Sequence, residues 1–584
     1  MFKTLFIIGA GFSVNLGAIT TLDIARAIDI VVNTDKKLIN RLEEINKQVL
    51  KGKLKFHLQK DLERTLLILL DGDGAGSLEE ALKKRERVID FLVSKYKQFF
   101  PDGNSEYFRY YLQDAYRKFD YLAFRSFYLQ WKEALNEKEK QNTPIVRFLT
   151  LLDKAYEENI SIPTEEVFTK KKNQREQIIY YNRPHRSKKA LDFYKYFTYK
   201  LFKIVLAHTP ETQKTRMYYN FFRDLILESI NNPEDLRRIT KRDLFLLPVE
   251  FLTFNWDPFL PFILIKANLY ANKRMEINTL HGDILPQTYV DFTWNIPIVR
   301  LDKQFNPQKK HEIWDEILIS EDTAYFVNKL TRKSWVYENS KIESNLFLQL
   351  IKLYAVHGLF NIRFCPYCNQ LFMVMPTKIK YLNVATYEGL RDLFLLDPIP
   401  SVHDMKIVSK KYKKTLLYEA YKKGRPDELP CPNCEYPTYF EDTPLSIQTI
   451  LKSDEIFFLR HLKNTVFNKL REYDHLIIIG YSFPEDDISN NFTIELYGSS
   501  TNHAKNKNGY KKSQKKKITI ISYNPTLQSK IWYKPEEIEK EPNLGFNLQE
   551  VKKLFPNAEI RISFLGWPDI LMKVHSWKEI LEFK

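Results

Sequence analysis

The sequence predicts an α/β protein: a Rossmann-like parallel sheet with a large helical insertion and a small zinc-ribbon module. Short apolar segments recur along the chain and stop at small or polar residues, as buried parallel strands do. Between the first two of them lies a long region with apolar residues three and four positions apart, which is typical of helices. The 4 cysteines form two Cys-x-x-Cys pairs, which is typical of one zinc site.

The first apolar segment opens the chain. Residues 2–8 are expected to form a buried strand that ends at Gly9, and a glycine-containing turn follows over residues 9–17. Thr21 is the expected N-cap of a helix over residues 21–28. Strand, glycine turn and helix in this order form the first unit of a nucleotide-binding fold, in which glycines let the backbone approach a pyrophosphate.

Further elements are expected in the second half of the chain. The predicted strands cover residues 249–253, 352–356, 476–479 and 518–522. The predicted helices cover residues 259–271 and 456–472. Ligands of open α/β sheets bind at the carboxyl ends of the strands. The residues that directly follow the predicted strands are therefore the candidate binding residues.

These elements divide the 584 residues into three parts, and a chain of this length can bury several cores. We expect the α/β domain to comprise residues 1–29, 246–360 and 445–584. The helical insertion is predicted over residues 30–245 and the zinc-ribbon module over residues 361–444.

The composition excludes several classes of protein. Hydrophobic residues make up 44% and charged residues 28%, so the chain is neither disordered nor fibrous. No apolar run approaches the ~20 residues of a membrane span, and the N-terminal run is too short for a signal peptide, so we expect a cytoplasmic protein. The net charge of +16 makes nucleic acid a candidate partner, although basic runs such as residues 505–517 are more often solvated loops.

The cysteine pairs are Cys365 with Cys368 and Cys431 with Cys434. A disulfide framework would scatter its cysteines, whereas two Cys-x-x-Cys pairs supply four thiolates for one tetrahedral zinc ion. The 62 residues between the pairs exceed the usual zinc-ribbon spacing, so we expect an insertion there. Four thiolates leave no open position for water, so this zinc would be structural; two pairs of unmetallated thiols are the alternative.

Five short motifs follow the expected strands or precede the cysteines. They are Gly9-Ala10-Gly11-Phe12-Ser13, Thr253-Phe254-Asn255-Trp256-Asp257, His357-Gly358, Gly480-Tyr481-Ser482, and Asn524. In this order they resemble the motifs of the sirtuin family, whose members combine an NAD-binding Rossmann-like domain with a zinc ribbon. The resemblance implies that NAD+ is bound through Gly9, Ala10, Gly11, Ser13, Thr253, Gly480, Ser482 and Asn524.

The chain departs from the protein-deacylating sirtuins in two places. Those enzymes continue with Ile-Pro-Asp-Phe-Arg after the glycine motif, where this chain has Gly17-Ala18-Ile19-Thr20-Thr21. A long helical region also precedes the asparagine motif. Both features resemble the divergent sirtuin-like proteins of bacterial antiphage systems, which consume NAD+. That branch implies a homo-oligomer and, for some members, a hexameric translocase ATPase as partner.

The resemblance implies an NAD+ hydrolase (NADase) that cleaves the nicotinamide–ribose bond, gives nicotinamide and ADP-ribose, and serves antiphage defence by depleting NAD+. Asn255 would orient the ribose hydroxyls or the attacking water, and Asp257 would bind the nicotinamide amide or support the same loop. A histidine would act as general base. His357, eight residues before the first cysteine, is favoured for this role, and His281, 26 residues after Asn255, is the alternative.

Two other functions stay open as alternatives. An NAD-dependent protein deacylase would use the same fold, but the absence of the Ile-Pro-Asp-Phe-Arg segment argues against it. A non-catalytic sensor of NAD or ADP-ribose, bound to nucleic acid or to a partner protein through its basic surface, would not need catalytic side chains. The retained asparagine and histidine favour catalysis over this second alternative.

Overall fold

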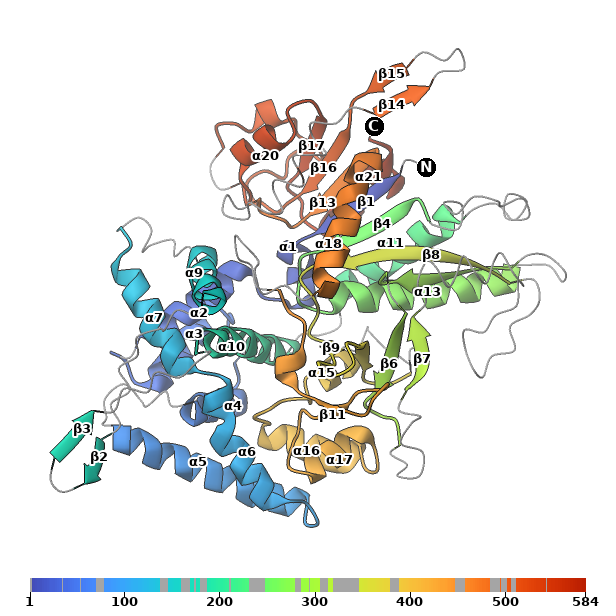
Figure 1. Cartoon of the computed structure of the whole chain (residues 1–584). Helices are drawn as coiled ribbons and strands as arrows, with labels where there is room; N and C mark the ends of the chain where they lie inside the picture. The colour runs from blue at the N-terminus through green and yellow to red at the C-terminus, as the bar shows by residue number, and fades with distance from the viewer. Residues whose placement is uncertain are drawn as a thin grey trace.

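The computed structural model describes most of the chain and has three parts: an α/β domain, a body of helices and a smaller region around the cysteines (Figure 1). The described residues are 3–33, 35–52, 54–69, 78–136, 145–158, 169–172, 175–178, 186–208, 212–230, 247–278, 285–293, 295–304, 314–318, 346–378, 388–446, 457–483, 494, 502–505, 511–541 and 544–583.

Seven parallel strands form the central sheet in the order β17-β16-β13-β1-β4-β8-β5. Their bounds are β1 (Thr4–Ile8), β4 (Val249–Thr253), β5 (Leu285–Asp291), β8 (Leu346–Ala355), β13 (His475–Ile479), β16 (Lys517–Ile521) and β17 (Glu559–Ser563). Every residue of β1, β4 and β13 is buried, because helices cover both faces of the sheet. The fold is therefore α/β with a Rossmann-like parallel sheet, as the sequence predicts.

Strand β1 lies where the sheet changes its winding direction, with β4 on one side and β13 on the other. Ile8 at the end of β1 pairs with Thr253 of β4 and with Ile479 of β13. The segments that follow these three strands therefore leave the sheet at the same level. Open α/β sheets bind their ligands at such a switch point.

Helices pack on both faces of the sheet. Helices α11 (Gln213–Ser229) and α13 (Phe259–Asn278) cover one face, where the rings of Phe6 in β1 and Phe221 in α11 lie 6.1 Å apart. Helix α18 (Phe457–Lys469) crosses the other face (Figure 1).

The helical body consists mainly of segments between β1 and β4. Its long helices are α2 (Thr21–Val32), α3 (Leu38–Gln48), α4 (Phe56–Ile68), α5 (Leu78–Phe99), α6 (Ser105–Lys118), α7 (Tyr121–Glu133), α9 (Ile145–Glu157) and α10 (Arg186–His208). A short hairpin, β2 (Thr169–Lys172) with β3 (Arg175–Ile178), lies between α9 and α10 along the chain. Helix α10 contacts both the α/β domain and the cysteine region.

The cysteine region contains a second sheet of four strands in the order β7-β6-β10-β9. These strands are β6 (Ile296–Arg300), β7 (Trp314–Leu318), β9 (Ile362–Phe364) and β10 (Leu371–Met375). Helices α15 (Glu388–Leu393), α16 (Val402–Lys411) and α17 (Leu416–Lys422) lie between the two cysteine pairs. The strands β11 (Leu429–Pro430) and β12 (Pro437–Thr438) flank the second pair.

The sequence prediction differs from the structure in details. Thr20, not Thr21, is the N-cap of α2: its hydroxyl accepts a hydrogen bond from Asp23 N, and the Asp23 carboxylate accepts one from Thr20 N. Helix α13 continues to Asn278, beyond its predicted end. Strand β17 was not predicted, because its first residue is exposed and it has no continuous apolar run.

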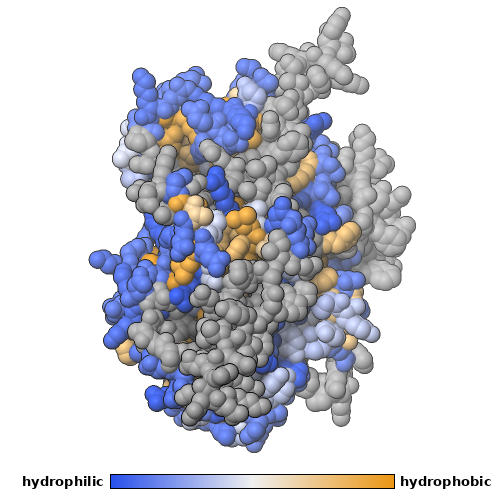
Figure 2. Space-filling model, turned by 60° about the vertical axis from the view of Figure 1, so that its left-hand side comes forward, coloured by the Kyte–Doolittle hydropathy of each residue, from blue (hydrophilic) through white to orange (hydrophobic). Residues whose placement is uncertain are grey.

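Hydrophilic residues dominate the described surface on the side shown in Figure 2, where apolar residues gather only in small separate patches. No helix among the described residues is both long enough and apolar enough to cross a membrane.

Candidate active site

The glycine motif brings the ends of β1 and β13 into direct backbone contact. Gly11 N donates a hydrogen bond to Gly480 O (3.0 Å), and Gly9 N donates one to Ile479 O (2.9 Å). A Cβ atom on Gly9 would lie 2.5 Å from Gly480 O, and one on Gly480, whose φ is +65°, would lie 2.3 Å from the amide nitrogen of Phe12. Side chains have no room here, so the fold itself requires these glycines at the switch point.

A polar cluster joins the glycine motif to the asparagine motif. Asn255 Nδ2 donates hydrogen bonds to Gly9 O (3.1 Å) and to Ser13 Oγ (3.2 Å). The Ser13 hydroxyl donates in turn to Asp257 Oδ1 (3.1 Å), which also accepts from Phe259 N (3.1 Å). The structure therefore brings together three residues that the sequence singles out, although they come from opposite ends of a long insertion.

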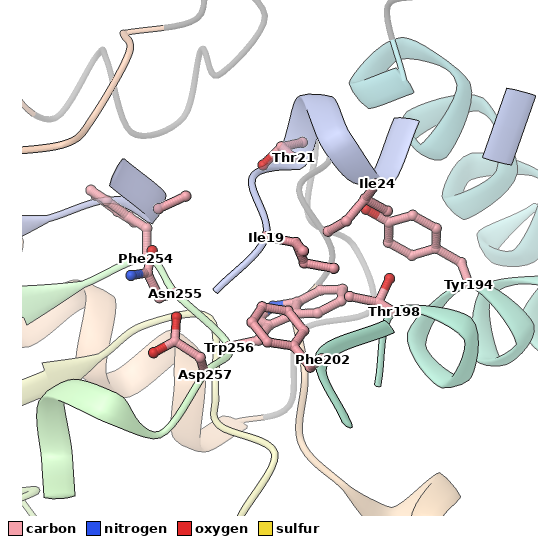
Figure 3. A pocket seen from close by; sticks show the side chains of 11 residues that line it. Ile19, Thr21, Ile24, Tyr194, Thr198, Phe202, Phe254, Asn255, Trp256 and Asp257 are labelled. Atoms are coloured by element: carbon pink, nitrogen blue, oxygen red, sulfur yellow. The ribbon is translucent and has the colours of Figure 1, made fainter. Parts of the chain in front are cut away.

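A small cavity, part of it open to solvent, lies beside this cluster (Figure 3). Four segments line it: the glycine motif, the start of α2 with the residues just before it, one side of α10, and the loop after β4. In Figure 3, Asn255 and Asp257 lie at one end, Tyr194 and Thr198 of α10 lie at the other, and Trp256 lies between them. The cavity thus has a polar end at the sheet and an aromatic end at the helical body.

Asp257 supplies a carboxyl group to this cavity. Burial raises the pKa of Asp257 to about 7, although the hydrogen bonds from Phe259 N and the Ser13 hydroxyl act in the opposite direction. Both protonation states are therefore populated near neutral pH, which is the range in which a carboxyl group can serve catalysis.

His357 lies behind the cavity and is not one of its lining residues. It follows β8, is 1% exposed, and its Nδ1 lies 3.0 Å from Phe254 O. Because a carbonyl oxygen can only accept, Nδ1 carries the proton in this hydrogen bond. His357 thereby holds the backbone next to Asn255. The alternative histidine, His281, lies outside the described residues.

The remaining residues predicted to bind the dinucleotide take several positions. Ala10 lines the cavity, and the Thr253 hydroxyl accepts a hydrogen bond from Asn255 N (3.1 Å). Ser482 is exposed at the end of β13. Asn524 is buried, and its Oδ1 accepts from Thr526 N (2.9 Å) and Thr526 Oγ1 (2.7 Å). Neither Ser482 nor Asn524 lines the cavity, since both lie on the β13–β16 side of the switch point.

The cysteine region is a candidate metal centre. The Sγ atoms of Cys365, Cys368, Cys431 and Cys434 all lie within 4.8 Å of one another. The Sγ pairs Cys365–Cys434 and Cys368–Cys431 are each 3.5 Å apart, which is too far for a disulfide at ~2.05 Å. Thiolates placed tetrahedrally at ~2.3 Å from zinc would lie about 3.8 Å apart. The four cysteines therefore fit a structural zinc ion.

The two cysteine pairs have the same local structure. Asn369 N donates to Cys365 O and Glu435 N donates to Cys431 O, each at 2.9 Å. Asn369 and Glu435 also share the left-handed conformation, with φ values of 58° and 61°. Each turn presents its two thiolates to a common point, as a zinc ribbon requires.

One lysine of the basic run is not available to a partner. The Lys516 side chain is buried, and its Nζ donates to Arg471 O and Tyr473 O, each at 2.7 Å. Burial lowers the pKa of Lys516 to about 8. The side chains of residues 505–514 lie outside the described part of the chain.

Sequence reasoning missed the contribution of α10 to the cavity. Tyr194, Thr198 and Phe202 line it from the helical body, but a helical pattern of apolar residues does not reveal which loop of the sheet it faces. The spacing of these residues, four apart on one helix face, was the only available signal.

The sequence matches no protein-family model and no curated protein. The chemistry of the site must therefore be argued from its own geometry. That geometry offers an oriented amide, a carboxyl group that titrates near pH 7, and an aromatic compartment next to both.

Proposed function

We propose that the protein is a sirtuin-like NAD+ glycohydrolase, which releases nicotinamide and ADP-ribose from NAD+. One observation supports this above all: Asn255 Nδ2 is hydrogen-bonded to Gly9 O and Ser13 Oγ, 246 and 242 residues away in the sequence. Two motifs that resemble those of sirtuins thus share one cavity at the switch point of a parallel sheet.

The two hydrogen bonds of Asn255 fix the direction of its side chain. With Nδ2 held, Oδ1 is the atom that accepts a hydrogen bond from a ribose hydroxyl or from the attacking water. Cleavage of a glycosidic bond passes through an oxocarbenium-like state, in which the leaving group departs before the nucleophile is fully bonded. Orientation of the ribose and of one water is therefore the main task of the site.

Asp257 supplies the negative charge that this reaction needs. As the bond breaks, the positive charge of the nicotinamide ring passes to the ribose, and a fixed carboxylate next to Asn255 stabilises it. The cationic ring of NAD+ also favours the ionised form of Asp257, whose pKa burial has raised to about 7. We assign to His357 the positioning of the loop, through its hydrogen bond to Phe254 O.

The family resemblance extends the proposal beyond the site. It favours a cytoplasmic effector of antiphage defence that depletes NAD+, forms a homo-oligomer, and acts with a hexameric translocase ATPase as some members of that branch do. Zinc held by the four cysteines has a structural role in this proposal.

Incubation of the full-length, zinc-loaded protein with NAD+, followed by chromatographic separation of the products, tests the function. The wild type should release nicotinamide and ADP-ribose in equal amounts. Asn255→Ala should lower the rate by a factor of about 100 or more, because a misplaced ribose or water costs at least that much. Asn104→Ala is the matched control: Asn104 caps α6 and does not line the cavity, and the rate should not change.

Two results would contradict the proposal. Nicotinamide release that persists in Asn255→Ala would show that this cavity is not the active site. Release that requires an acyl-lysine peptide would identify the deacylase alternative.

A further inference from the structure

Thr198 in the middle of α10 is fully buried, at 0% exposure, and its hydroxyl has no hydrogen-bond partner among the described residues. Other hydroxyls inside helices of this protein bond to the carbonyl four residues earlier: Thr65 Oγ1 to Asp61 O (3.0 Å), Thr150 Oγ1 to Val146 O (2.8 Å) and Ser229 Oγ to Leu225 O (2.6 Å). Thr198 does not make this bond, and it lines the cavity instead.

A buried hydroxyl without a partner is unfavourable, so a ligand that satisfies it gains affinity. The surroundings of Thr198 define which ligand fits. Tyr194 and Phe202 flank it on α10, and Tyr194 meets Trp256 edge to face with ring centroids 5.9 Å apart. These aromatic walls favour a flat ring, and their faces also attract a cationic ring.

Thr198 is held in place from the opposite side of α10. Lys200 Nζ and Lys203 Nζ donate to Asp397 Oδ2 at 2.6 Å and 2.7 Å, and the Tyr196 hydroxyl donates to Asp397 Oδ1 at 2.8 Å. These buried contacts fix the helix against the cysteine region, so the Thr198 hydroxyl is presented to the cavity from a rigid element.

We propose that α10 forms the subsite for the leaving group of the reaction, a planar heteroaromatic amide, and that the Thr198 hydroxyl donates a hydrogen bond to its amide oxygen. The inference rests on the proposed glycohydrolase function. The ribose lies beside Asn255 and Asp257 at the polar end of the cavity, and the ring extends past Ile19 and Trp256 toward Thr198 (Figure 3). The helical insertion thus completes a site that the α/β domain begins.

Nicotinamide is the probe for this subsite, with the full-length, zinc-loaded protein. Calorimetry gives its dissociation constant, and inhibition of NAD+ hydrolysis gives its inhibition constant. Thr198→Val should weaken both by about 10-fold, because it removes the hydroxyl at nearly constant shape. Thr198→Ser should restore binding to within about 2-fold of the wild type.

Two controls separate recognition from folding. The ligand-free Thr198→Val variant should melt no lower than the wild type, since a methyl group replaces an unpartnered hydroxyl. Thr150→Val, which removes a hydroxyl bonded within α9, should leave nicotinamide binding unchanged.

Nicotinamide binding that is as tight in Thr198→Val as in the wild type would overturn the inference, as would an equal loss in Thr198→Ser. Failure of the glycohydrolase proposal has a different signature: Thr198→Val would still weaken nicotinamide binding, but the wild type would release no nicotinamide from NAD+. A wild type that binds neither nicotinamide nor NAD+ would overturn both.

Discussion

Helix α10 carries buried polar side chains on two faces, and the two faces satisfy them differently. On the face toward the cysteine region, the Asp397 carboxylate accepts from Lys200, Lys203 and the Tyr196 hydroxyl, and also from Ile399 N at 3.0 Å. On the face toward the cavity, the Thr198 hydroxyl has no partner among the described residues.

The carboxyl groups near the two faces also have pKa values that are shifted in opposite directions from the ordinary value. Burial alone would raise the pKa of Asp397, but Lys200 and Lys203 hold it below its usual range. Asp257 has no such partner cation among the residues that the structure describes, and burial raises its pKa to about 7. A fully paired buried cluster stabilises the fold, whereas an incompletely paired one indicates a place for a ligand.

Loss of zinc should have the largest effect on this arrangement. Structural zinc sites contribute about 10–16 kcal/mol of binding free energy, so its removal should unfold the cysteine region and leave Lys200 and Lys203 without their partner. Metal analysis should find one zinc per chain, and chelation should lower the melting temperature. A chelated protein that contains no zinc and melts like the untreated one would contradict the assignment.

Asp397→Ala should be the most destabilising single substitution near α10. It leaves the charge of Lys200 buried and unpaired, which costs about 4 kcal/mol, within the range for a broken buried pair, whereas Lys203 keeps its ion pair with Asp404. Denaturant unfolding measures the loss. Glu228→Ala, which removes an exposed ion pair with Lys578, is the control and should shift the midpoint little. Equal shifts of the unfolding midpoint in the two variants would show that the Asp397 cluster stabilises the fold no more than an exposed ion pair does.

The contribution of Asp257 to folding stability should change with pH in the opposite direction to that of a paired carboxylate. Its folded pKa of about 7 lies above the ordinary value of 3.8, so the folded state binds the proton more tightly and loses stability as pH rises from about 4 to 7. At roughly 1.4 kcal/mol per pKa unit the loss is about 4 kcal/mol. Unfolding of the wild type beside Asp257→Asn between pH 4 and 8 measures it. Parallel pH profiles would show that Asp257 does not titrate in this range.

Titration of Asp257 should also change the activity, which should rise with pH where the stability falls. In the proposed reaction the ionised form of Asp257 stabilises the developing positive charge, so kcat/KM for NAD+ should fall below pH 7 by about tenfold per pH unit. Asp257→Asn should have low activity with no such slope. A wild-type profile that is flat from pH 5 to 8 would assign another role to Asp257.

A pair of tyrosines gives the smallest and most closely matched comparison. Tyr196→Phe removes the hydrogen bond to Asp397 and should cost about 1.5–3 kcal/mol, because the acceptor is charged. Tyr194→Phe, on the cavity face, should cost much less and should keep the aromatic wall for nicotinamide in place. A larger loss of unfolding free energy in Tyr194→Phe than in Tyr196→Phe would show that the cavity face, not the Asp397 face, stabilises the fold.

The sequence predicted the strands that position the site because those strands are buried on both sides. Strands β1, β4 and β13 are continuous apolar runs, and the residues after them could be assigned to one edge of the sheet. The cysteine spacing likewise predicted the cluster. The contribution of Thr198 and the raised pKa of Asp257 could not be predicted, because both depend on how the helical body packs against the sheet.

A crystal structure of the Asn255→Ala variant with NAD+ tests the central claim most directly, because a slow variant retains the intact substrate. The account predicts that the nicotinamide ribose lies beside position 255 and Asp257, and that the ring enters the compartment lined by α10. NAD+ bound at any other place, with this cavity empty, would contradict it.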